Sequence, residues 1–515
     1  MTTGDSGTIR LPAQVGDALD APMARDADHE AVVGSDRRLT YGQLDIAIDH
    51  AASTLFGLGV RRGSTVGISL PNSTELVVLF YATMRLGAIF LGLNANLAPP
   101  EKSYILDDAG AQFLITDHTS AEALDPIVDL PVFPSSIESP GPWLADDTVS
   151  PSPYPRPICR FDEAAGIAYT SGTTGRPKGV THSHRNLLLP GASLVAVRGY
   201  GPDLRRGDCA SLTILNLQVT STLLTAQAGG AQIVMDRVDP VGIATWIREE
   251  RVNSWFGVPT MLHGLATSPD VVAEDLATLR DVWTGGTHAP PSVRQAFEQR
   301  FGHRVYATYG MTEVPTVVTI EPFGGPHAPG SSGQLLPQLV VDIRDDEGVV
   351  QPANCVGEIT VRAQDAGPWG GLYRPMLGYH GRPAETAQAV RQGVLFTGDI
   401  GELDDEGNLI VRDRRHALIL RGGANVYPAE VERVLSELAG VTGAAVIGTP
   451  DERLGQRVAA VVELAPGSDL TVDNLQAHCL KNLARYKVPE QWRLTTLSRN
   501  AMGKVVRSDV ERLFA

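Results

Sequence analysis

Tyr169-Thr-Ser-Gly-Thr-Thr-Gly-Arg-Pro-Lys-Gly179 combines three glycines, four Ser or Thr hydroxyls and one lysine within eleven residues. Glycines let the backbone approach a bulky anion and point successive N–H groups at it, while hydroxyls and a lysine add donors and charge. The purine-nucleotide P-loop has a different spacing, because here Lys178 follows Arg176-Pro177 and precedes Gly179. The stretch therefore predicts a phosphate-binding loop of another kind, the alternative being a Gly/Thr-rich surface loop.

The composition of the 515-residue chain is that of a large globular protein, with 43% apolar and 20% charged residues. At roughly 150 residues per domain, the length predicts two to four domains. A formal charge of −16 argues against nucleic acid and against an anionic membrane surface as partners.

The cysteines and the apolar stretches indicate the cellular compartment in which the protein is expected. Cys159, Cys209, Cys355 and Cys479 lie far apart without a C-x-x-C pair, which predicts reduced thiols in a cytoplasmic protein and no zinc site. The first residues lack the charged and apolar regions of a signal peptide. The apolar stretch Leu76–Ala98 contains Arg85, Asn94 and Asn96, so it predicts a buried helix and strand and no membrane span.

Strands and helices alternate along the first 330 residues, which predicts α/β layers with mostly parallel sheets. The expected strands are Thr65–Leu70, Ala111–Thr116, Gln232–Met235 and Arg304–Ala307, and the expected helices are Glu75–Leu86 and Pro291–Arg300. Ser135–Pro157 is rich in Pro and Ser and is expected to be an exposed connector.

From Gly330 onward the pattern changes to short strands separated by Asp/Glu/Gly turns, which predicts an antiparallel barrel or sheet. The expected strands here are Val340–Arg344, Gly357–Arg362 and Asn408–Arg412. The last hundred residues predict a small α+β domain with helices Pro428–Leu438 and Val472–Leu483 and strands Ala444–Thr449 and Arg457–Leu464.

Four further motifs carry groups suited to a nucleotide. Tyr309-Gly-Met-Thr-Glu313 predicts a strand-end turn with an aromatic ring to stack on adenine, a hydroxyl for phosphate and a carboxylate for magnesium. Thr397-Gly-Asp399 predicts a tight turn whose carboxylate accepts from ribose hydroxyls. Arg412–Pro428 combines basic residues with a glycine turn before a helix, and Asn500–Arg507 places one lysine on a glycine-flanked turn.

The five motifs, in this order, resemble those of the adenylate-forming (ANL) superfamily, which contains AMP-forming acyl-CoA synthetases, or acid-CoA ligases. Leu39–Leu44, Gly57–Gly63 and Gly87-Ala88 also resemble its N-terminal part, so the resemblance covers almost the whole chain. It implies an N-terminal adenylation domain over residues 1–413, built from layered α/β subdomains plus a β-barrel-like part. It also implies a hinge at 414–416 and a small, mobile α+β C-terminal domain over 417–515.

The resemblance also implies roles for individual residues. The catalytic residues would be Lys504, Thr312 and Glu313, with Glu313 also holding Mg²⁺. ATP and coenzyme A would be bound by Thr170, Ser171, Gly172, Thr173, Thr174, Gly175, Lys178, Gly286, Thr287, Tyr309, Asp399, Arg414, Gly422 and Gly423. The acyl pocket would be lined by Asn216, Gly257, Val258, Gly285, His288, Gly310 and Met311, and His416 would be the hinge residue.

The chain departs from the family pattern at a few positions. His416 stands where the hinge residue is usually Asp or Lys, and Asn216 where many relatives have a histidine or an aromatic residue. Cys209–Met235 spans 27 residues without a charge, which argues against a partner for the ammonium group of an amino acid. A small polar residue at 216 would open the pocket to a bulky acid, although core packing explains most of this segment equally well.

The resemblance implies activation of a hydrophobic fatty, aryl or polycyclic carboxylic acid to acyl-AMP, followed by thioester formation with coenzyme A. Two alternatives remain at this point: a ligase that loads a carrier protein or another nucleophile, and a nucleotide-binding protein without activity. The sequence leaves the acid, the pathway and a monomer or homodimer open.

Overall fold

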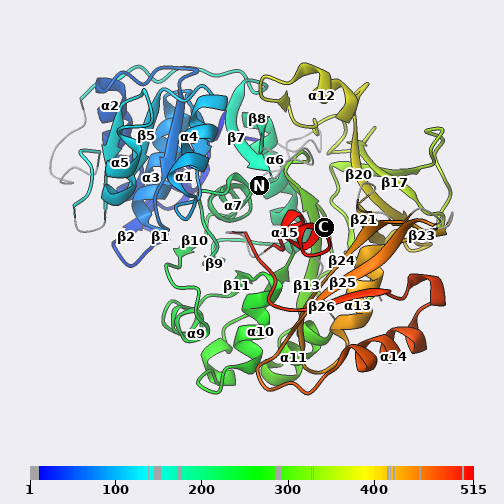
Figure 1. Cartoon of the computed structure of the whole chain (residues 1–515). Coiled ribbons are helices and arrows are strands. Elements are labelled where there is room, and N and C mark those ends of the chain that lie inside the picture. The colour runs from blue at the N-terminus through cyan, green and yellow to red at the C-terminus, as the bar shows by residue number, and fades with distance from the viewer. Residues whose placement is uncertain are drawn as a thin grey trace.

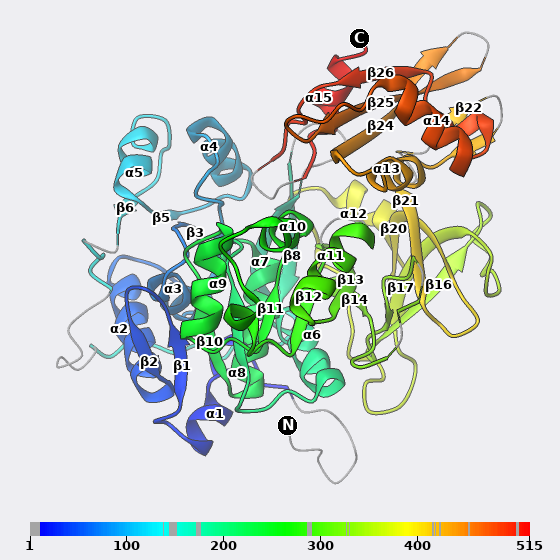
Figure 2. The ribbon, with the colours of Figure 1, turned by 90° about the horizontal axis from the view of Figure 1, so that it is seen from below.

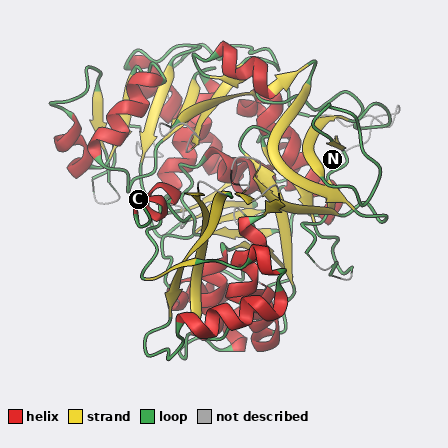
Figure 3. Ribbon diagram, turned by 45° about the vertical axis from the view of Figure 1, so that its right-hand side comes forward, coloured by secondary structure: helices red, strands yellow, loops and turns green. Residues whose placement is uncertain are grey.

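The computed structural model of the 515-residue chain describes residues 11–136, 139–143, 152–170, 177–285, 291–325, 327–328, 330–414, 417, 419–421, 424–451, 454–500 and 504–515. These form a large N-terminal domain and a small C-terminal domain, as predicted (Figure 1). In the large domain helices lie both between the strands and on the outer surface, and α3 and α6 are almost entirely buried (Figure 3).

The first sheet of the N-terminal domain has nine strands and is parallel through its centre, from β13 to β1. In order across the sheet they are β15 (Gln334–Leu335), β14 (Thr316–Ile320), β13 (Val305–Met311), β12 (Asp281–Thr284), β11 (Ser254–Phe256), β9 (Arg205–Asp208), β10 (Ala231–Val234), β1 (Glu30–Val33) and β2 (Arg38–Thr40). Helices α9 (Pro240–Glu249), α10 (Pro259–Thr267) and α11 (Pro291–Phe301) pack on it through Ile243, Leu262 and Phe297, which are fully buried.

The second sheet has seven strands and carries both ends of the Gly/Thr-rich stretch. Its order is β18 (Gly378–Tyr379), β8 (Lys178–Ser183), β7 (Ala164–Thr170), β4 (Ile89–Gly92), β3 (Thr65–Ser69), β5 (Phe113–Thr116) and β6 (Val132–Pro134). Helices α3 (Thr74–Arg85), α4 (Pro99–Asp108), α5 (His118–Leu124) and α6 (His184–Arg198) accompany it, and α2 (Tyr41–Gly57) packs on α3 and contacts β1 and β2 of the first sheet.

Helix α3 shows how the local sequence builds this layer. It begins after Ser73, whose hydroxyl accepts from the backbone N–H of Leu76, and every one of its residues is buried. The apolar stretch Leu76–Ala98 is therefore a buried helix followed by the buried strand β4, as predicted. None of the helices in the described part of the chain has both the length and the apolar composition of a membrane span.

The third sheet is antiparallel, as the turn-rich sequence after Gly330 predicts. It contains β16 (Leu339–Arg344), β17 (Gly357–Ala363), β20 (Val394–Leu403), β19 (Val390–Arg391) and β21 (Leu409–Arg414), next to helix α12 (Pro383–Ala389). Short segments complete the domain: η1 (Val15–Asp17), α1 (Asp20–Arg25), α7 (Leu215–Leu217), the π-helix η2 (Gln218–Leu223), α8 (Leu224–Ala228) and η3 (Ala273–Leu276).

The C-terminal domain has its own sheet and its own apolar cores. The sheet contains β23 (Ala424–Val426), β22 (Ile419–Arg421), β25 (Gly455–Leu464), β24 (Val441–Asp451) and β26 (Gln491–Leu494). Around it lie α13 (Pro428–Ser436), α14 (Val472–Asn482), η5 (Arg485–Lys487) and α15 (Arg507–Arg512). Figure 2 shows this domain beside strands β20 and β21, where α13 contacts β21 of the third sheet.

Two sequence-based expectations about local structure need correction. Much of the described part of Ser135–Pro157 is exposed, as expected, but Ser135 and Trp143 are fully buried and both donate to the carboxylate of Glu75 at 2.5 Å. Thr397-Gly-Asp399 is not a separate turn but lies inside strand β20, where Gly398 adopts a φ of 72°. In both cases long-range contacts override the turn-forming residues.

Candidate active site

The carboxyl ends of three neighbouring parallel strands bring much of the predicted acyl pocket together. Gly257 and Val258 follow β11, Gly285 follows β12, and Gly310 and Met311 end β13. The strands are in register, and the backbone N–H of Gly257 donates to the carbonyl of Trp283 at 3.0 Å. Ligands of open α/β sheets bind outside the carboxyl ends of the strands, so this edge is the candidate site.

Thr312 and Glu313 lie in a tight turn between β13 and β14. A Cβ on Gly310 would come within 1.6 Å of the carbonyl oxygen of Thr316, so only glycine permits the close approach of the two strands. Thr316 has a φ of 81°, an uncommon conformation for a β-branched residue. Such strain persists only where the surroundings determine the backbone, and here it accompanies the turn of the Tyr309–Glu313 motif.

A buried histidine holds the backbone of this turn. His182 Nε2 lies 2.7 Å from the carbonyl oxygen of Thr312, and Asn186 Nδ2 lies 3.3 Å from His182 Nδ1. Because a carbonyl only accepts, Nε2 carries the proton and Nδ1 accepts from the amide. Burial lowers the pKa of His182 to about 4, so the imidazole is neutral at ordinary pH.

The Glu313 side chain is held by the segment that leads into β18. Tyr379 Oη donates to Glu313 Oε1 at 3.0 Å, and the backbone N–H of Met376 donates to the Glu313 carbonyl at 3.1 Å. The Tyr379 ring also faces Lys178, whose Nζ lies 5.5 Å from the ring centroid. Tyr379 therefore contacts both the predicted magnesium ligand and the predicted phosphate-binding lysine.

Thr170 and Lys178 are paired across β7 and β8, which places the two ends of the Gly/Thr-rich stretch side by side. Lys178 also forms an ion pair with Glu385 at the start of α12. The remaining predicted members of this loop, Ser171, Gly172, Thr173, Thr174 and Gly175, lie outside the described residues. So do Gly286, Thr287, His288, His416, Gly422 and Gly423.

The residues predicted to bind adenosine also lie next to one another. Tyr309 Oη donates to Asp399 Oδ2 at 2.6 Å, and Asp399 pairs with Arg414 across β20 and β21. Only the backbone of Arg414 is described. Asp399 is 5% exposed. This hydrogen bond joins the Tyr309–Glu313 motif to the Thr397–Asp399 motif, although ninety positions separate Tyr309 from Asp399.

Asn216 lies near the same turn. Its Nδ2 is 3.5 Å from Thr312 Oγ1, on helix α7 directly before the buried π-helix η2. Single π-turns inside helices are frequent at functional sites. The structure thus places the predicted pocket residue beside the predicted phosphate-binding threonine.

Lys504 belongs to the C-terminal domain. It lies in a turn closed by hydrogen bonds from Asn500 N to Lys504 O at 2.8 Å and from Lys504 N to Asn500 Oδ1 at 3.0 Å. The pairing of Arg499 with Val505 continues this turn as a short hairpin.

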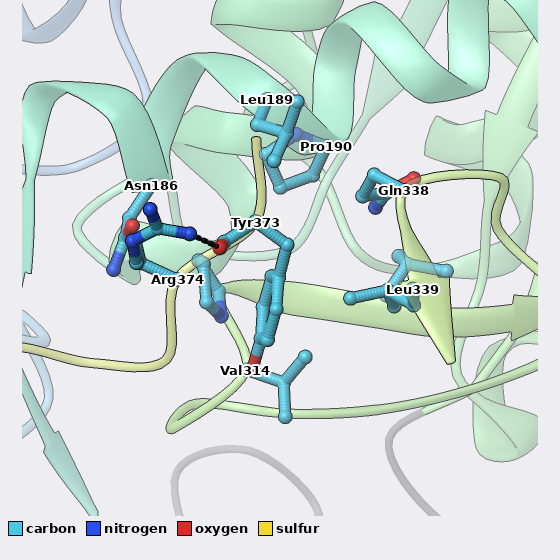
Figure 4. Close-up of a pocket in the computed structure, with 10 residues that line it drawn as sticks. Asn186, Leu189, Pro190, Val314, Gln338, Leu339, Tyr373 and Arg374 are labelled. Carbon is cyan, nitrogen blue, oxygen red and sulfur yellow. Dashed lines mark hydrogen bonds between the residues drawn. The ribbon is translucent and has the colours of Figure 1, made fainter. Parts of the chain in front are cut away.

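A small pocket lies beside the Thr312–Glu313 turn. Figure 4 shows Val314, which directly follows Glu313, beside Tyr373 in this pocket. Its walls are Asn186, Leu189, Pro190, Val314, Pro315, Val317, Gln338, Leu339, Tyr373 and Arg374. None of these is a predicted site residue, so the pocket is distinct from the candidate site.

Sequence reasoning missed Tyr379, His182 and Glu385. Tyr379 and Glu385 lie outside the motifs, and His182 follows the Gly/Thr-rich stretch with no spacing that would mark its role. Their contacts with Glu313, Thr312 and Lys178 exist only in the folded chain.

Comparisons with known proteins agree with the motif-based resemblance. A family model described as AMP-binding enzyme matches residues 19–368, and one described as AMP-binding enzyme C-terminal domain matches residues 430–504. The chain is 31% identical over 493 residues to the long-chain-fatty-acid–CoA ligase FadD13 of Mycobacterium tuberculosis, covering 92% of this chain and 93% of that protein. It is 34% identical over 486 residues to a feruloyl-CoA synthase of an Amycolatopsis species, covering 92% and 94%.

The fold is similar to that of ATP-bound MatB from Rhodopseudomonas palustris. The two structures align with a TM-score of 0.88 and 27% identity, over 97% of this chain and 99% of the other.

Proposed function

The chain belongs to the family of AMP-binding enzymes, and on that premise we propose that it is an AMP-forming acid-CoA ligase. The proposal rests on groups that lie close together at one edge of the N-terminal domain. Tyr309, in the same motif as Thr312 and Glu313, bonds to Asp399. Tyr379 links Glu313 to Lys178, because its hydroxyl donates to Glu313 and its ring faces Lys178. These groups come from motifs that are far apart in the sequence.

The reaction needs no nucleophile from the enzyme. The carboxylate of the acid attacks the α-phosphorus of ATP, the bond to the bridging oxygen breaks, and pyrophosphate leaves with the electron pair. The thiol of coenzyme A then attacks the acyl carbon of the mixed anhydride and loses its proton. The thioester bond forms as the bond to AMP breaks, and AMP leaves with the electron pair. The contribution of the protein is to position the reactants and to stabilise charge on the phosphates.

We assign the adenosine to Tyr309, Asp399 and Arg414, the α-phosphate to Thr312, and the β- and γ-phosphates to the loop that ends at Lys178. Glu313 fits Mg²⁺, because its carboxylate offers the oxygen ligands that this ion prefers and a hydrogen bond from Tyr379 orients it. Bound there, the ion would neutralise phosphate charge.

We further propose that residues 414–416 form a hinge and that the domain after it brings Lys504 to the reacting carboxylate. Gly422 and Gly423 would then face the pantetheine arm during thioester formation. The separate cores of the two domains support relative motion of this kind.

For the acid we propose a hydrophobic fatty, aryl or polycyclic carboxylate. The helical run Leu215–Ala228 has no charged residue to pair with a substrate ammonium group. Asn216, beside Thr312, would leave more room near the acyl group than a histidine or aromatic side chain there.

The test is acid-dependent pyrophosphate release across fatty, aryl and polycyclic acids, with and without coenzyme A, followed by mass detection of the thioester. A coenzyme A ester from one class of acid is the expected result. An acyl-adenylate that accumulates despite coenzyme A would instead identify a carrier protein or another nucleophile as the acceptor. No release of pyrophosphate with any acid would overturn the proposal.

A further inference from the structure

The two ends of the Gly/Thr-rich loop are tied to elements that no motif includes. The loop leaves strand β7 after Tyr169-Thr170 and returns through Pro177 into strand β8. Tyr169 pairs with Gly179 across these strands, so both ends start from one hairpin.

The first end is held by Asp108, the last residue of helix α4. Tyr169 Oη donates to Asp108 Oδ2 at 2.6 Å. Arg382, just before α12, donates to both oxygens of the same carboxylate, to Oδ2 at 3.0 Å and to Oδ1 at 2.6 Å. The two side chains of this ion pair are 19% and 22% exposed, and a two-pronged pair of this kind is both strong and directional.

The second end is held by Tyr104, four residues before Asp108 and therefore on the same face of α4. Its Oη lies 3.1 Å from the carbonyl oxygen of Pro177, which accepts the hydrogen bond, and 3.4 Å from Arg382 Nη2. Three residues after Arg382, Glu385 pairs with Lys178 on the same side of the loop. One face of α4 thus contacts both ends of the loop, while Arg382 bonds to that face and Glu385 contacts the second end through Lys178.

The ionic centre of this arrangement stays charged. Burial acts to raise the pKa of Asp108, but the hydrogen bonds from Arg382 and Tyr169 outweigh it, so the pKa lies below its ordinary value. The hydrogen bond to Asp108 raises the pKa of Arg382 in turn. Acidification within the usual assay range therefore leaves the contact intact.

We infer that Tyr104, Asp108, Tyr169 and Arg382 form a clamp that positions the loop for the β- and γ-phosphates of ATP. The inference rests on the proposed function, since it takes the loop to be the phosphate site. The four are positioning residues: Asp108 accepts from Tyr169 at one end of the loop, Tyr104 donates to Pro177 at the other, and Arg382 donates to both Asp108 and Tyr104. They would act on the loop through these two ends.

The clamp predicts selective loss of affinity. Ligands with β- and γ-phosphates depend on the loop, whereas AMP has only the α-phosphate, which is assigned to Thr312. A variant that loosens the clamp should weaken binding of ATP and of pyrophosphate and leave binding of AMP nearly unchanged. General destabilisation of the domain would weaken all three alike.

The experiment is calorimetric titration of the full-length protein with Mg·ATP, Mg·pyrophosphate and AMP, for the wild type and for Asp108→Asn, Tyr169→Phe and Arg382→Lys. Each variant should raise the Kd for ATP and pyrophosphate about tenfold, as expected for losing a hydrogen bond to a charged group, and the Kd for AMP less than twofold. Tyr41→Phe is the control for loss of a tyrosine hydroxyl, since Tyr41 is buried and donates at 2.8 Å to Gly230 O, away from the loop. It should change none of the three.

Unchanged ATP affinity in Tyr169→Phe and Arg382→Lys, or an equal loss for AMP, would overturn the clamp. These two variants also decide the matter if Asp108→Asn fails to fold, because each keeps the Asp108 carboxylate. A wild type that binds neither ATP nor AMP would instead overturn the proposed function, and the clamp with it.

Discussion

The turn that carries Thr312 and Glu313 is bonded to distant segments of its own domain, whereas the turn that carries Lys504 is closed within a short hairpin. His182 and Met376 hold the backbone of the first turn, and Tyr379 holds its carboxylate. In the second turn, Asn500 bonds to Lys504 in both directions.

The apolar cores divide in the same way. The clusters around Leu435 and Val461 contain only residues of the C-terminal domain, and a hydrogen bond from Ala429 N to Asp413 Oδ2 at 2.8 Å joins that domain to β21. The turn with Thr312 and Glu313 is thus fixed by contacts across the large domain, whereas Lys504 belongs to a domain with apolar cores of its own. Separate cores of this kind are what the proposed hinge motion requires.

The largest effect is expected from removing the lysine. Lys504→Ala should lower acid-dependent pyrophosphate release by roughly 10²–10³-fold, as for other donors that stabilise charge in a transition state. Thioester formation from supplied acyl-adenylate should change much less, because the first half-reaction is bypassed. Lys481→Ala, on the exposed side of α14, is the control. Equal losses in both half-reactions would contradict a role of Lys504 in adenylation alone.

Independent cores predict independent unfolding. Leu435→Ala, at a fully buried position of the C-terminal core, should lower the stability of that domain by about 3 kcal/mol. Calorimetry should then show one transition shifted and the other unchanged. Leu262→Ala, buried against the first sheet, should do the reverse. If both transitions shift with either variant, the domains unfold as one unit.

The bond between Tyr379 and Glu313 tests how rigidly the first turn is held. Tyr379→Phe removes a hydrogen bond to a carboxylate and should lower kcat for adenylation about tenfold, with a higher Mg²⁺ requirement. Tyr373→Phe is a close control, because the Tyr373 hydroxyl is buried without a hydrogen-bond partner in the described part of the chain. Equal effects of the two variants would show that Tyr379 acts only through packing.

The smallest effect concerns pH and has opposite signs in the two domains. Burial lowers the pKa of His182 and of His184 to about 4, below that of the unfolded chain, so the unfolded state binds more protons between pH 4 and 6.5. The N-terminal domain should therefore lose stability as the pH falls through this window, by about 1 kcal/mol per histidine at pH 5.5.

Glu432 gives the stability of the C-terminal domain the opposite dependence on pH. Burial raises the pKa of this carboxyl to about 7, with Arg507 opposing, so the folded C-terminal domain binds more protons and loses stability as the pH rises from 4.5 to 7. The side chain is 26% exposed, so solvent screening makes this the weaker effect. Thermal unfolding between pH 5 and 7 should show the two transitions shifting in opposite directions; a shift in the same direction would contradict the assignment.

Most of the architecture could be predicted from local patterns. The strand-helix rhythm marked β3, α3 and α11 to within a few residues, and the acidic turns marked the third sheet. These succeed because the hydrophobic period and the turn residues lie within one segment. The expectation for Ser135–Pro157 holds for its exposed residues but not for Trp143, which is buried and donates to Glu75, 68 residues away.

The contiguous motifs were enough to predict the family and the chemistry, because their residue types suit phosphate, magnesium or adenine whatever surrounds them. What holds those motifs in place is visible only in the folded chain. Glu313 meets Tyr379 across 66 positions, Thr312 meets His182 across 130, and Asp108 meets Arg382 across 274. A tyrosine or an arginine looks the same in the sequence whether it lies exposed or positions a catalytic turn, because its partner is chosen by packing and not by spacing along the chain.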